Sequence, residues 1–188
     1  MYSKSFVQRR DMTNILVVTG SVRPNSVNSK IVPIVENKLK EQGDTVTIAD
    51  LADLNLPFFN ESVSPTDPSF APTNERVQQW TQMVANAEAI VFVTPEYNHN
   101  MSPVQLNAVD WIGKEWKDKP VALIGYGWGT GGGQAHDAAR EALAVNLGAK
   151  VSEMQANLFF TKDIAPDGSI IDEVTVNEKV GAALGGIK

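Results

Sequence analysis

The most informative absence in this 188-residue sequence is cysteine, of which there is none. Disulfides, thiolate metal sites and cysteine nucleophiles are therefore excluded. A chain without cysteine is compatible with a reducing compartment, and we expect a cytoplasmic location. Positive charge is also scarce, because 16 Lys and Arg face 22 Asp and Glu and leave a net charge of -6. This balance argues against nucleic acid or an anionic membrane as a partner, since both require a broad positive surface.

Long apolar runs and several catalytic motifs are missing too. No run approaches the roughly 20 apolar residues that cross a bilayer. With two histidines and no tight cluster of His, Asp and Glu, the sequence predicts no dedicated metal site. The absence of a G-x-S-x-G elbow disfavours a hydrolase. A Rossmann dinucleotide domain and a P-loop NTPase are disfavoured as well, because no G-x-G-x-x-G follows the first predicted strand and no G-x-x-x-x-G-K-[ST] occurs.

The length predicts a single domain over residues 1–188, which buries roughly 70% of the surface that its unfolded chain exposes. Residues 1–11 carry Lys4, Arg9 and Arg10 with no apolar stretch behind them. They make a poor signal peptide, so we expect a flexible extension of the domain.

Hydrophobic patterning divides the rest of the chain into alternating strands and helices. Short apolar or β-branched runs predict five strands, at 15–18, 45–50, 89–93, 120–124 and 150–160. Apolar residues at three- and four-residue spacing predict helices at 29–39, 74–87, 104–116, 134–147 and 172–184. Gly43 and Gly148 are expected to end the first and fourth of these helices.

The alternation predicts an α/β fold with a parallel sheet. Right-handed crossovers favour a flavodoxin-like three-layer sandwich with strand order 2-1-3-4-5, in which strands one, three and four are neighbours. Three unusual loops, at 19–28, 94–100 and 125–133, follow those three strands. All three should open on the carboxyl edge of the sheet, so a shared ligand site is the economical interpretation.

The first loop combines Ser21, Arg23, Ser26 and Asn28 between a strand and the start of a helix. Hydroxyls, an arginine fork and a helix dipole together suit a phosphate. Two alternatives stay open: Arg23 is a solvated surface residue, or Ser26 or Asn28 merely caps the helix. Because the turn is single and short, a mononucleotide phosphate fits it better than a pyrophosphate.

The other two loops are suited to a planar ring. The second, from Pro95 to Asn98, can lay backbone N–H groups along the edge of a heterocycle such as a flavin. In the third, Tyr126 and Trp128 could flank a ring while the glycines allow the backbone to approach it closely. Glu96 as a lone general acid or base has weak support, and the glycines alone could serve only a tight turn.

Residues 51–72 contain four prolines and are expected to be irregular, as a lid or rim would be. The first half of this segment is apolar and should pack over another part of the chain, through Leu54, Leu56, Phe58 and Phe59. Of the two histidines, His99 is a candidate for the pocket rim. His136 is expected to be an ordinary surface or capping residue of a helix.

Taken together, Gly20-Ser21-Val22-Arg23-Pro24-Asn25-Ser26-Val27-Asn28, Pro95-Glu96-Tyr97-Asn98 and the loop from Tyr126 to Gly133 resemble the NAD(P)H-dependent FMN reductase family. These proteins are flavodoxin-like quinone, azo-dye and chromate reductases. The resemblance spans about 14–150, in the right order and spacing. It implies FMN-phosphate contacts at Ser21, Arg23, Ser26 and Asn28. It also implies a ring loop at Pro95, Glu96, Tyr97 and Asn98, and a far wall at Tyr126, Gly127, Trp128 and Gly129.

The same resemblance implies a ping-pong reaction in which NAD(P)H reduces bound FMN and a quinone-like or other broad acceptor reoxidises it, with no catalytic side chain. It also implies a homodimer or homotetramer, for which Trp111 and Trp116 are interface candidates unless they lie in the core. Three departures are visible: the segment from Gln105 to Asp110 lacks a common Lys, the third loop is a residue longer, and Gly125 replaces a common Ser. The competing hypotheses are a flavodoxin-type electron carrier and an FMN protein whose redox state controls a partner.

Overall fold

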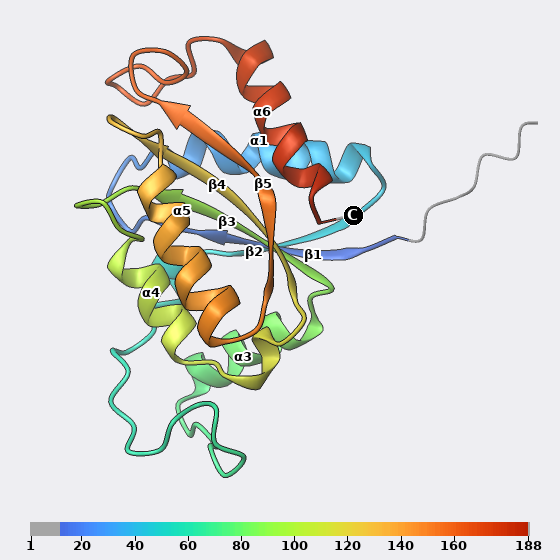
Figure 1. Ribbon diagram of the computed structural model, residues 1–188, viewed down its shortest axis with the longest axis vertical. Helices are drawn as coiled ribbons and strands as arrows, with labels where there is room; N and C mark the ends of the chain where they lie inside the picture. Colours follow the sequence, from blue (N-terminus) through green and yellow to red (C-terminus); the bar gives the residue numbers. More distant parts are fainter. Residues whose placement is uncertain (1–11, 188) are drawn as a thin grey trace, which may run out of the picture.

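The computed structural model describes residues 12–187, so the predicted extension at 1–11 lies outside the described residues. Five parallel strands form one sheet in the order β2-β1-β3-β4-β5 (Figure 1), which confirms the predicted topology. The strands are β1 (Asn14–Thr19), β2 (Thr45–Ala49), β3 (Ala89–Pro95), β4 (Pro120–Gly127) and β5 (Lys150–Phe159).

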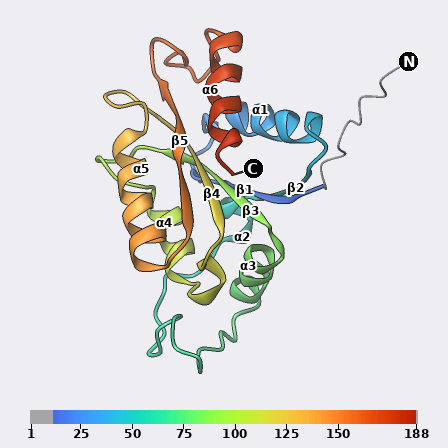
Figure 2. The ribbon, with the colours of Figure 1, turned by 45° about the vertical axis from the view of Figure 1, so that its right-hand side comes forward.

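Helices cover both faces of this sheet and complete the predicted three-layer sandwich. One face carries α1 (Asn28–Glu41) and α6 (Glu173–Gly185). The other carries α3 (Glu75–Asn86), α4 (Pro103–Asp110) and α5 (Gly133–Arg140), as Figures 1 and 2 show. Gly43 and Gly148 follow the first and fourth predicted helices with φ of 87° and 71°, as expected of glycines that end helices.

The strand sequences explain why both faces are covered. In β1, Ile15 and Val17 point to the α1–α6 side, while Leu16 and Val18 point to the opposite side. Every residue of β3 is buried. A strand with apolar side chains on both faces is stable only between two layers, so the continuous apolar runs and the helices on each side have one common cause.

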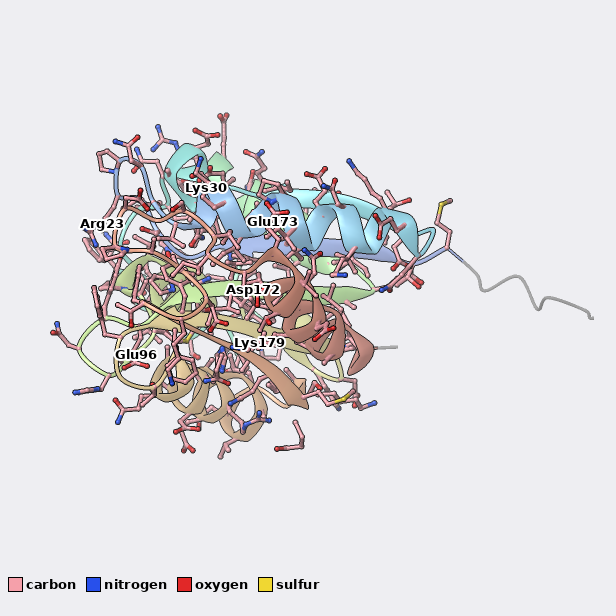
Figure 3. All side chains as sticks on the ribbon, turned by 90° about the horizontal axis from the view of Figure 1, so that it is seen from above. Arg23, Lys30, Glu96, Asp172, Glu173 and Lys179 are labelled. Atoms are coloured by element: carbon pink, nitrogen blue, oxygen red, sulfur yellow. The ribbon has the colours of Figure 1, made fainter. Side chains whose placement is uncertain are left out.

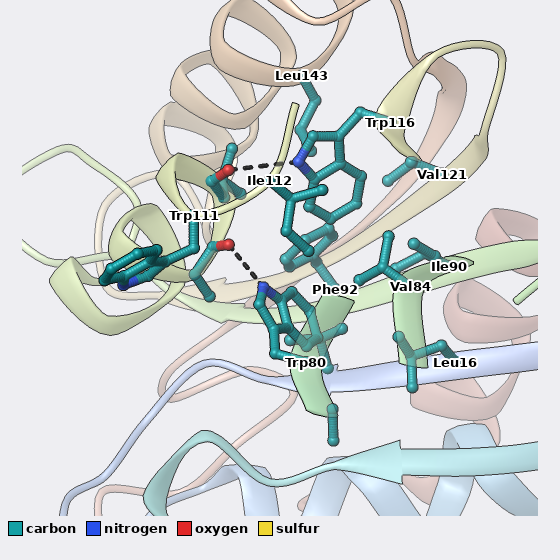
Figure 4. Close-up of a cluster of buried hydrophobic side chains, with 14 of the residues drawn as sticks. Leu16, Trp80, Val84, Ile90, Phe92, Trp111, Ile112, Trp116, Val121 and Leu143 are labelled. Atoms are coloured by element: carbon teal, nitrogen blue, oxygen red, sulfur yellow. Dashed lines mark hydrogen bonds between the residues drawn. The ribbon is translucent and has the colours of Figure 1, made fainter. Parts of the chain in front are cut away.

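The α3–α4–α5 face contains most of the buried aromatic side chains of the described residues (Figure 4). Trp80, Trp111 and Trp116 are each fully buried there or nearly so. Of the two alternatives for Trp111 and Trp116, a subunit interface or the core, the structure confirms the core. Each indole N–H donates to a backbone carbonyl, at 2.7 Å for Trp80 to Ala108, 2.7 Å for Trp111 to Pro57 and 3.3 Å for Trp116 to Val109.

Two predicted helices are shorter than their apolar patterns. The helix expected at 104–116 ends at Asp110 and is followed by a separate 3₁₀ turn at Lys114–Trp116. Gly113 lies between them, where a Cβ would sit 2.2 Å from the carbonyl oxygen of Pro65. The helix expected at 134–147 ends at Arg140 and continues as a π-helical segment, Glu141–Asn146. A wider turn keeps similar apolar spacing, so periodicity could not separate the two forms.

The segment at 51–72 is irregular apart from α2 (Leu51–Leu54), a short helix that the sequence did not predict. The Asp50 side chain caps it by accepting from the N–H of Ala52. As expected, Leu54 is buried and Leu56 and Phe59 pack on the aromatic core, but Phe58 is 80% exposed. The apolar composition therefore identified the buried half of this segment correctly and was wrong for Phe58.

Candidate functional site

A pocket of about 330 Å³ opens at the carboxyl edge of the sheet. Arg23 and Glu96, from two different loops, lie at this same end of the molecule (Figure 3). The predicted site residues that line it are Ser21, Arg23, Ser26, Pro95, Glu96, Tyr97, Tyr126, Gly127 and Trp128. The other predicted residues, Asn28, Asn98 and Gly129, are not part of this lining.

In the first loop, Arg23 is exposed, and no carboxylate of the described residues pairs with its guanidinium. The N-cap of α1 is Val27, whose side chain makes no capping bond. The Ser26 hydroxyl accepts from the N–H of Asn28 at 3.2 Å and so supports the start of the helix. Capping therefore accounts for part of the role of Ser26, while Arg23 remains a cation without an internal partner.

The side chain of Asn28 makes two hydrogen bonds inside the protein. Its side-chain N–H donates to the carbonyl of Val93 at 3.3 Å, and its Oδ1 accepts from the Tyr126 hydroxyl at 2.7 Å. Both polar groups of this buried side chain are thus engaged inside the protein. Burial raises the pKa of Tyr126 to about 12, so its phenol stays neutral and holds the first loop to the third.

The second loop directs fewer N–H groups outward than expected. The N–H of Glu96 donates to the carbonyl of Tyr126 at 3.0 Å, and that of Tyr97 donates to Asn100 at 3.1 Å. Pro95 has no N–H. Contacts to a ring through the backbone of these three residues must therefore use their carbonyl groups or Cα atoms. The Tyr97 hydroxyl bonds to the Ser21 hydroxyl at 3.0 Å and joins the second loop to the first.

A third contact joins the second and third loops. The Glu96 side chain is 7% exposed and accepts a short hydrogen bond from the Thr130 hydroxyl. The exposed His99, which is not part of the pocket lining, brings Nδ1 to 3.4 Å from the same carboxylate. Hydrogen bonds therefore connect the three loops in pairs, and Thr130 is a site residue that sequence reasoning missed.

The pocket has a further wall that the sequence did not predict, formed by Phe160 and the turn 166–168. The Phe160 ring stacks on Trp128 with centroids 4.9 Å apart and an angle of 23° between planes. Asp163 anchors the segment, because its carboxylate accepts from the N–H of Phe159 at 2.8 Å and pairs with Lys179 of α6 at 2.7 Å. In the sequence, the run Pro166-Asp167-Gly168 is typical of a turn and is the local feature that could have indicated this part of the wall.

His136 corrects another expectation, since it is a core residue with 0% exposure rather than a surface residue. Neither ring nitrogen makes a hydrogen bond of good geometry with a described residue. Burial, with a smaller effect of Arg140, lowers the pKa of His136 to about 4. The ring fills the space that a side chain at Gly125 would need, because a Cβ there would lie 2.5 Å from Nε2. This explains the glycine that departs from the family pattern.

At the switch point between β1 and β3, Gly20 lets the first loop lie directly against the second. A Cβ on Gly20 would be 2.4 Å from the Val93 oxygen and 2.5 Å from Pro95 Cδ. The buried Gln105 of α4 donates to the carbonyls of Val18, at 3.4 Å, and Val93, at 3.2 Å. Gln105 thus links the ends of two central strands, β1 and β3.

Comparison with known proteins places this site in a family. The profile described as NADPH-dependent FMN reductase matches residues 13–160, which include all three loops. The chain belongs to this family. It is accordingly an oxidoreductase that works with FMN and NAD(P)H, with the flavodoxin-like fold expected of such proteins. The wall at 166–168 lies beyond the matched region.

Individual relatives agree with the family assignment. An NAD(P)H-dependent FMN reductase of Nectria sp is 33% identical over 175 residues, covering 89% of this chain and 85% of its own length. An NADPH:quinone oxidoreductase of Arabidopsis thaliana is 27% identical over 88% of this chain and 86% of its own length. The flavoenzyme NAD(P)H:(acceptor) oxidoreductase FerB of Paracoccus denitrificans superposes with a TM-score of 0.72 at 26% identity, covering 94% of this chain and 97% of that one.

The residues present fit an FMN. The pocket has an unpaired arginine and two serine hydroxyls at one part of its wall and a flat aromatic surface at another. These groups match a charged phosphate joined to a planar ring. Within residues 12–187, no three His, Asp or Glu side chains gather as a metal site would require, and no helix has the length and apolarity to cross a membrane.

Proposed function

We propose that the pocket binds FMN with its phosphate at Arg23, Ser21 and Ser26 and its ring between the second and third loops. The unpaired Arg23 beside two hydroxyls supports the phosphate end. Tyr97, Gly127 and Trp128 border the ring end, and Asn28 orients Tyr126 rather than touching the phosphate. Asn98 and Gly129 do not line the pocket in this structure, and their contacts with FMN stay predictions.

Bound FMN would supply the group that takes a hydride from NAD(P)H and then passes two electrons to an acceptor, in ping-pong order. The residues of this chain bind, orient and shield that group. The exposed face of Trp128, which is 64% accessible and stacked on Phe160, favours planar acceptors such as quinones. No side chain is assigned a catalytic role.

The observation that carries this proposal is the convergence of three loops on one pocket that contains both an unpaired arginine and a flat aromatic wall. The purified protein should be yellow, and NADH or NADPH should bleach it without oxygen. Initial rates at several fixed quinone concentrations should give parallel double-reciprocal lines. A protein that binds FMN but stays oxidised under excess NADH and NADPH would contradict the proposed reaction.

Replacement of Arg23 by alanine should weaken FMN binding by about 1.5–3 kcal/mol, because a charge-assisted contact is lost. Flavin fluorescence titration of apo-protein measures the change. Lys30, an exposed cation on the same α1 start, supplies the matched control: Lys30→Ala should leave the affinity within about threefold, as expected of surface substitutions. Equal effects of the two changes would place the phosphate elsewhere.

A flavodoxin-type electron carrier, or an FMN protein that regulates a partner, would share this pocket. Arg23 favours the reductase, because a carrier of that type typically holds the phosphate with hydroxyls. The homodimer or homotetramer and the cytoplasmic location stay predictions, and Trp111 and Trp116 are buried in the core of the single chain. Light scattering coupled to size exclusion measures the mass of the assembly directly.

A further inference from the structure

We propose that Thr130 is a positioning residue that holds the Glu96 carboxylate, and with it the second loop, against the third loop at the ring end of the pocket. This link would set both the affinity for FMN and its reduction potential. The inference rests on the proposed FMN site. It is independent of the identity of the acceptor.

Thr130 is itself held from several sides, which makes it a rigid donor. Its Oγ1 accepts from the N–H of Gln134 at 3.3 Å, at the start of α5, while its proton goes to Glu96. Its carbonyl accepts from the Asn157 side chain of β5 at 2.9 Å. The hydroxyl therefore stays fixed relative to the sheet, and Glu96 is the member of the pair that would move without it.

The Glu96 carboxylate is nearly shielded from water, so it needs hydrogen-bond donors from the protein. Its side chain is 7% exposed and lines the pocket. Gly127 leaves room for it, since a Cβ on Gly127 would lie 3.1 Å from Glu96 Cβ. Among the described residues, the other partner of the Glu96 carboxylate is the exposed His99, whose Nδ1 lies 3.4 Å from Oε1. A buried carboxylate that loses its hydrogen-bond donor turns toward water, and the second loop would follow it.

The charge of Glu96 has its own consequence. Reduction of a flavin places additional negative charge on the ring, and a fixed carboxylate in the same pocket opposes that charge. The hydrogen bond to Thr130 therefore controls the position of the second loop, while the charge of the Glu96 carboxylate controls the reduction potential of bound FMN. The two contributions can be separated by substitution.

The experiment uses the full-length protein with Thr130→Val, Thr130→Ser and Glu96→Gln. Valine keeps the shape of threonine without its hydroxyl, serine keeps the hydroxyl, and glutamine keeps an acceptor for Thr130 without the charge. The readouts are the FMN dissociation constant, the midpoint potential of bound FMN and the melting temperature of the apo-protein. Thr81→Val is the control, because it removes a hydroxyl that bonds to Val77 in α3, away from the pocket.

Thr130→Val should raise the FMN dissociation constant about tenfold, the size expected for one charge-assisted hydrogen bond. Thr130→Ser should restore it, and Thr81→Val should leave it unchanged. Glu96→Gln should keep the affinity within about threefold and shift the midpoint potential upward. Thr130→Val should raise the FMN dissociation constant by a smaller factor in the Glu96→Gln background than in the wild type. The reason is that both substitutions act on the same hydrogen bond, between Thr130 and residue 96.

A purely structural Thr130 would give another result: Thr130→Val would lower the apo melting temperature through Gln134 and leave the FMN affinity unchanged. That outcome would overturn the positioning role, as would equal effects of valine and serine. An unchanged potential in Glu96→Gln would overturn the role of the charge. If the wild-type protein bound no FMN at all, the proposed function would itself fail, and these variants would differ from it only in melting temperature.

Discussion

Two regions of the molecule differ in whether their buried polar atoms have hydrogen-bond partners. One is the aromatic core under α3 and α4, and the other is the carboxyl edge of the sheet. In the core, every indole N–H of Trp80, Trp111 and Trp116 has a carbonyl partner. At the carboxyl edge, buried side-chain atoms lack partners among the described residues, in Thr94, Gln105, Gln134 and His136. The three tryptophans of the core lie outside the pocket lining, whereas the unpartnered atoms belong to residues next to the three site loops or on the helices that follow them.

This difference separates stability from function within one sheet. A buried hydrogen bond that is made contributes about 1 kcal/mol net, while an unmade one costs 1–3 kcal/mol as an order of magnitude. Natural chains keep such unmade bonds mainly where a site demands them. We therefore expect substitutions in the aromatic core to destabilise the fold strongly and some substitutions at the carboxyl edge to be neutral or favourable.

The largest expected effect is in the aromatic core. Trp80→Ala should lower the free energy of unfolding by about 3–5 kcal/mol, because it leaves a cavity and an unpaired carbonyl at Ala108. Urea denaturation of the apo-protein measures the loss. Trp128→Ala, which removes an exposed tryptophan, should change the stability by less than about 0.5 kcal/mol. Similar losses for both tryptophans would remove the distinction between the two regions.

The next largest expected effect is on the pH dependence of stability. It concerns His136, whose ring nitrogens are among the unpartnered buried atoms near the carboxyl edge. Its pKa is about 4 in the folded chain against about 6.5 in the unfolded chain, so the unfolded state binds more protons between these values. Stability should therefore fall as the pH falls from about 6.5 to about 4, with about 3 kcal/mol lost through this group. His136→Gln, which cannot take up that proton, should show a shallower decline in denaturant titrations across this range. Parallel curves for the two proteins would contradict the assignment.

The smallest effect compares two hydroxyls near the ends of neighbouring strands. Thr94→Val removes an unpartnered hydroxyl and should be neutral or stabilise the protein by up to about 1 kcal/mol. Thr19→Val removes a hydroxyl that accepts from Leu51 at 3.1 Å and contacts Asp50, and it should destabilise by about 1–2 kcal/mol. Thermal unfolding of both variants decides the matter, and a loss for Thr94→Val as large as for Thr19→Val would show that its hydroxyl is paired.

Much of the fold and part of the site followed from local patterns. Apolar runs such as 89–93 are buried strands because helices must cover both faces, and the switch-point rule then brings the loops after β1, β3 and β4 together. Ser21, Arg23 and Tyr126 could be assigned to one pocket by this route. Their partners could not, because the bond from Tyr126 to Asn28 depends on how two distant loops fold against each other.

The features that were missed depend on three-dimensional fit. His136 is buried because Gly125 has no Cβ, a relation between residues on different elements that no periodicity shows. The wall at 166–168 exists because Asp163 pairs with Lys179 of α6 and folds the chain back over the first loop. Gly132, with φ of 97°, places the turn that presents Thr130 to Glu96. Sequence can mark such residues as unusual, but contact between them is a property of the assembled fold.

The wall formed by Phe160 and the turn 166–168 has a consequence for biosynthesis. The ribosome makes the chain from its N-terminus, so β1, β3 and β4, with their three loops, are all synthesised before this wall. The wall is fixed by Lys179, which lies on the last helix of the sandwich. Phe160 and the turn 166–168 follow all five strands in the sequence, so this wall of the pocket is synthesised after the whole sheet.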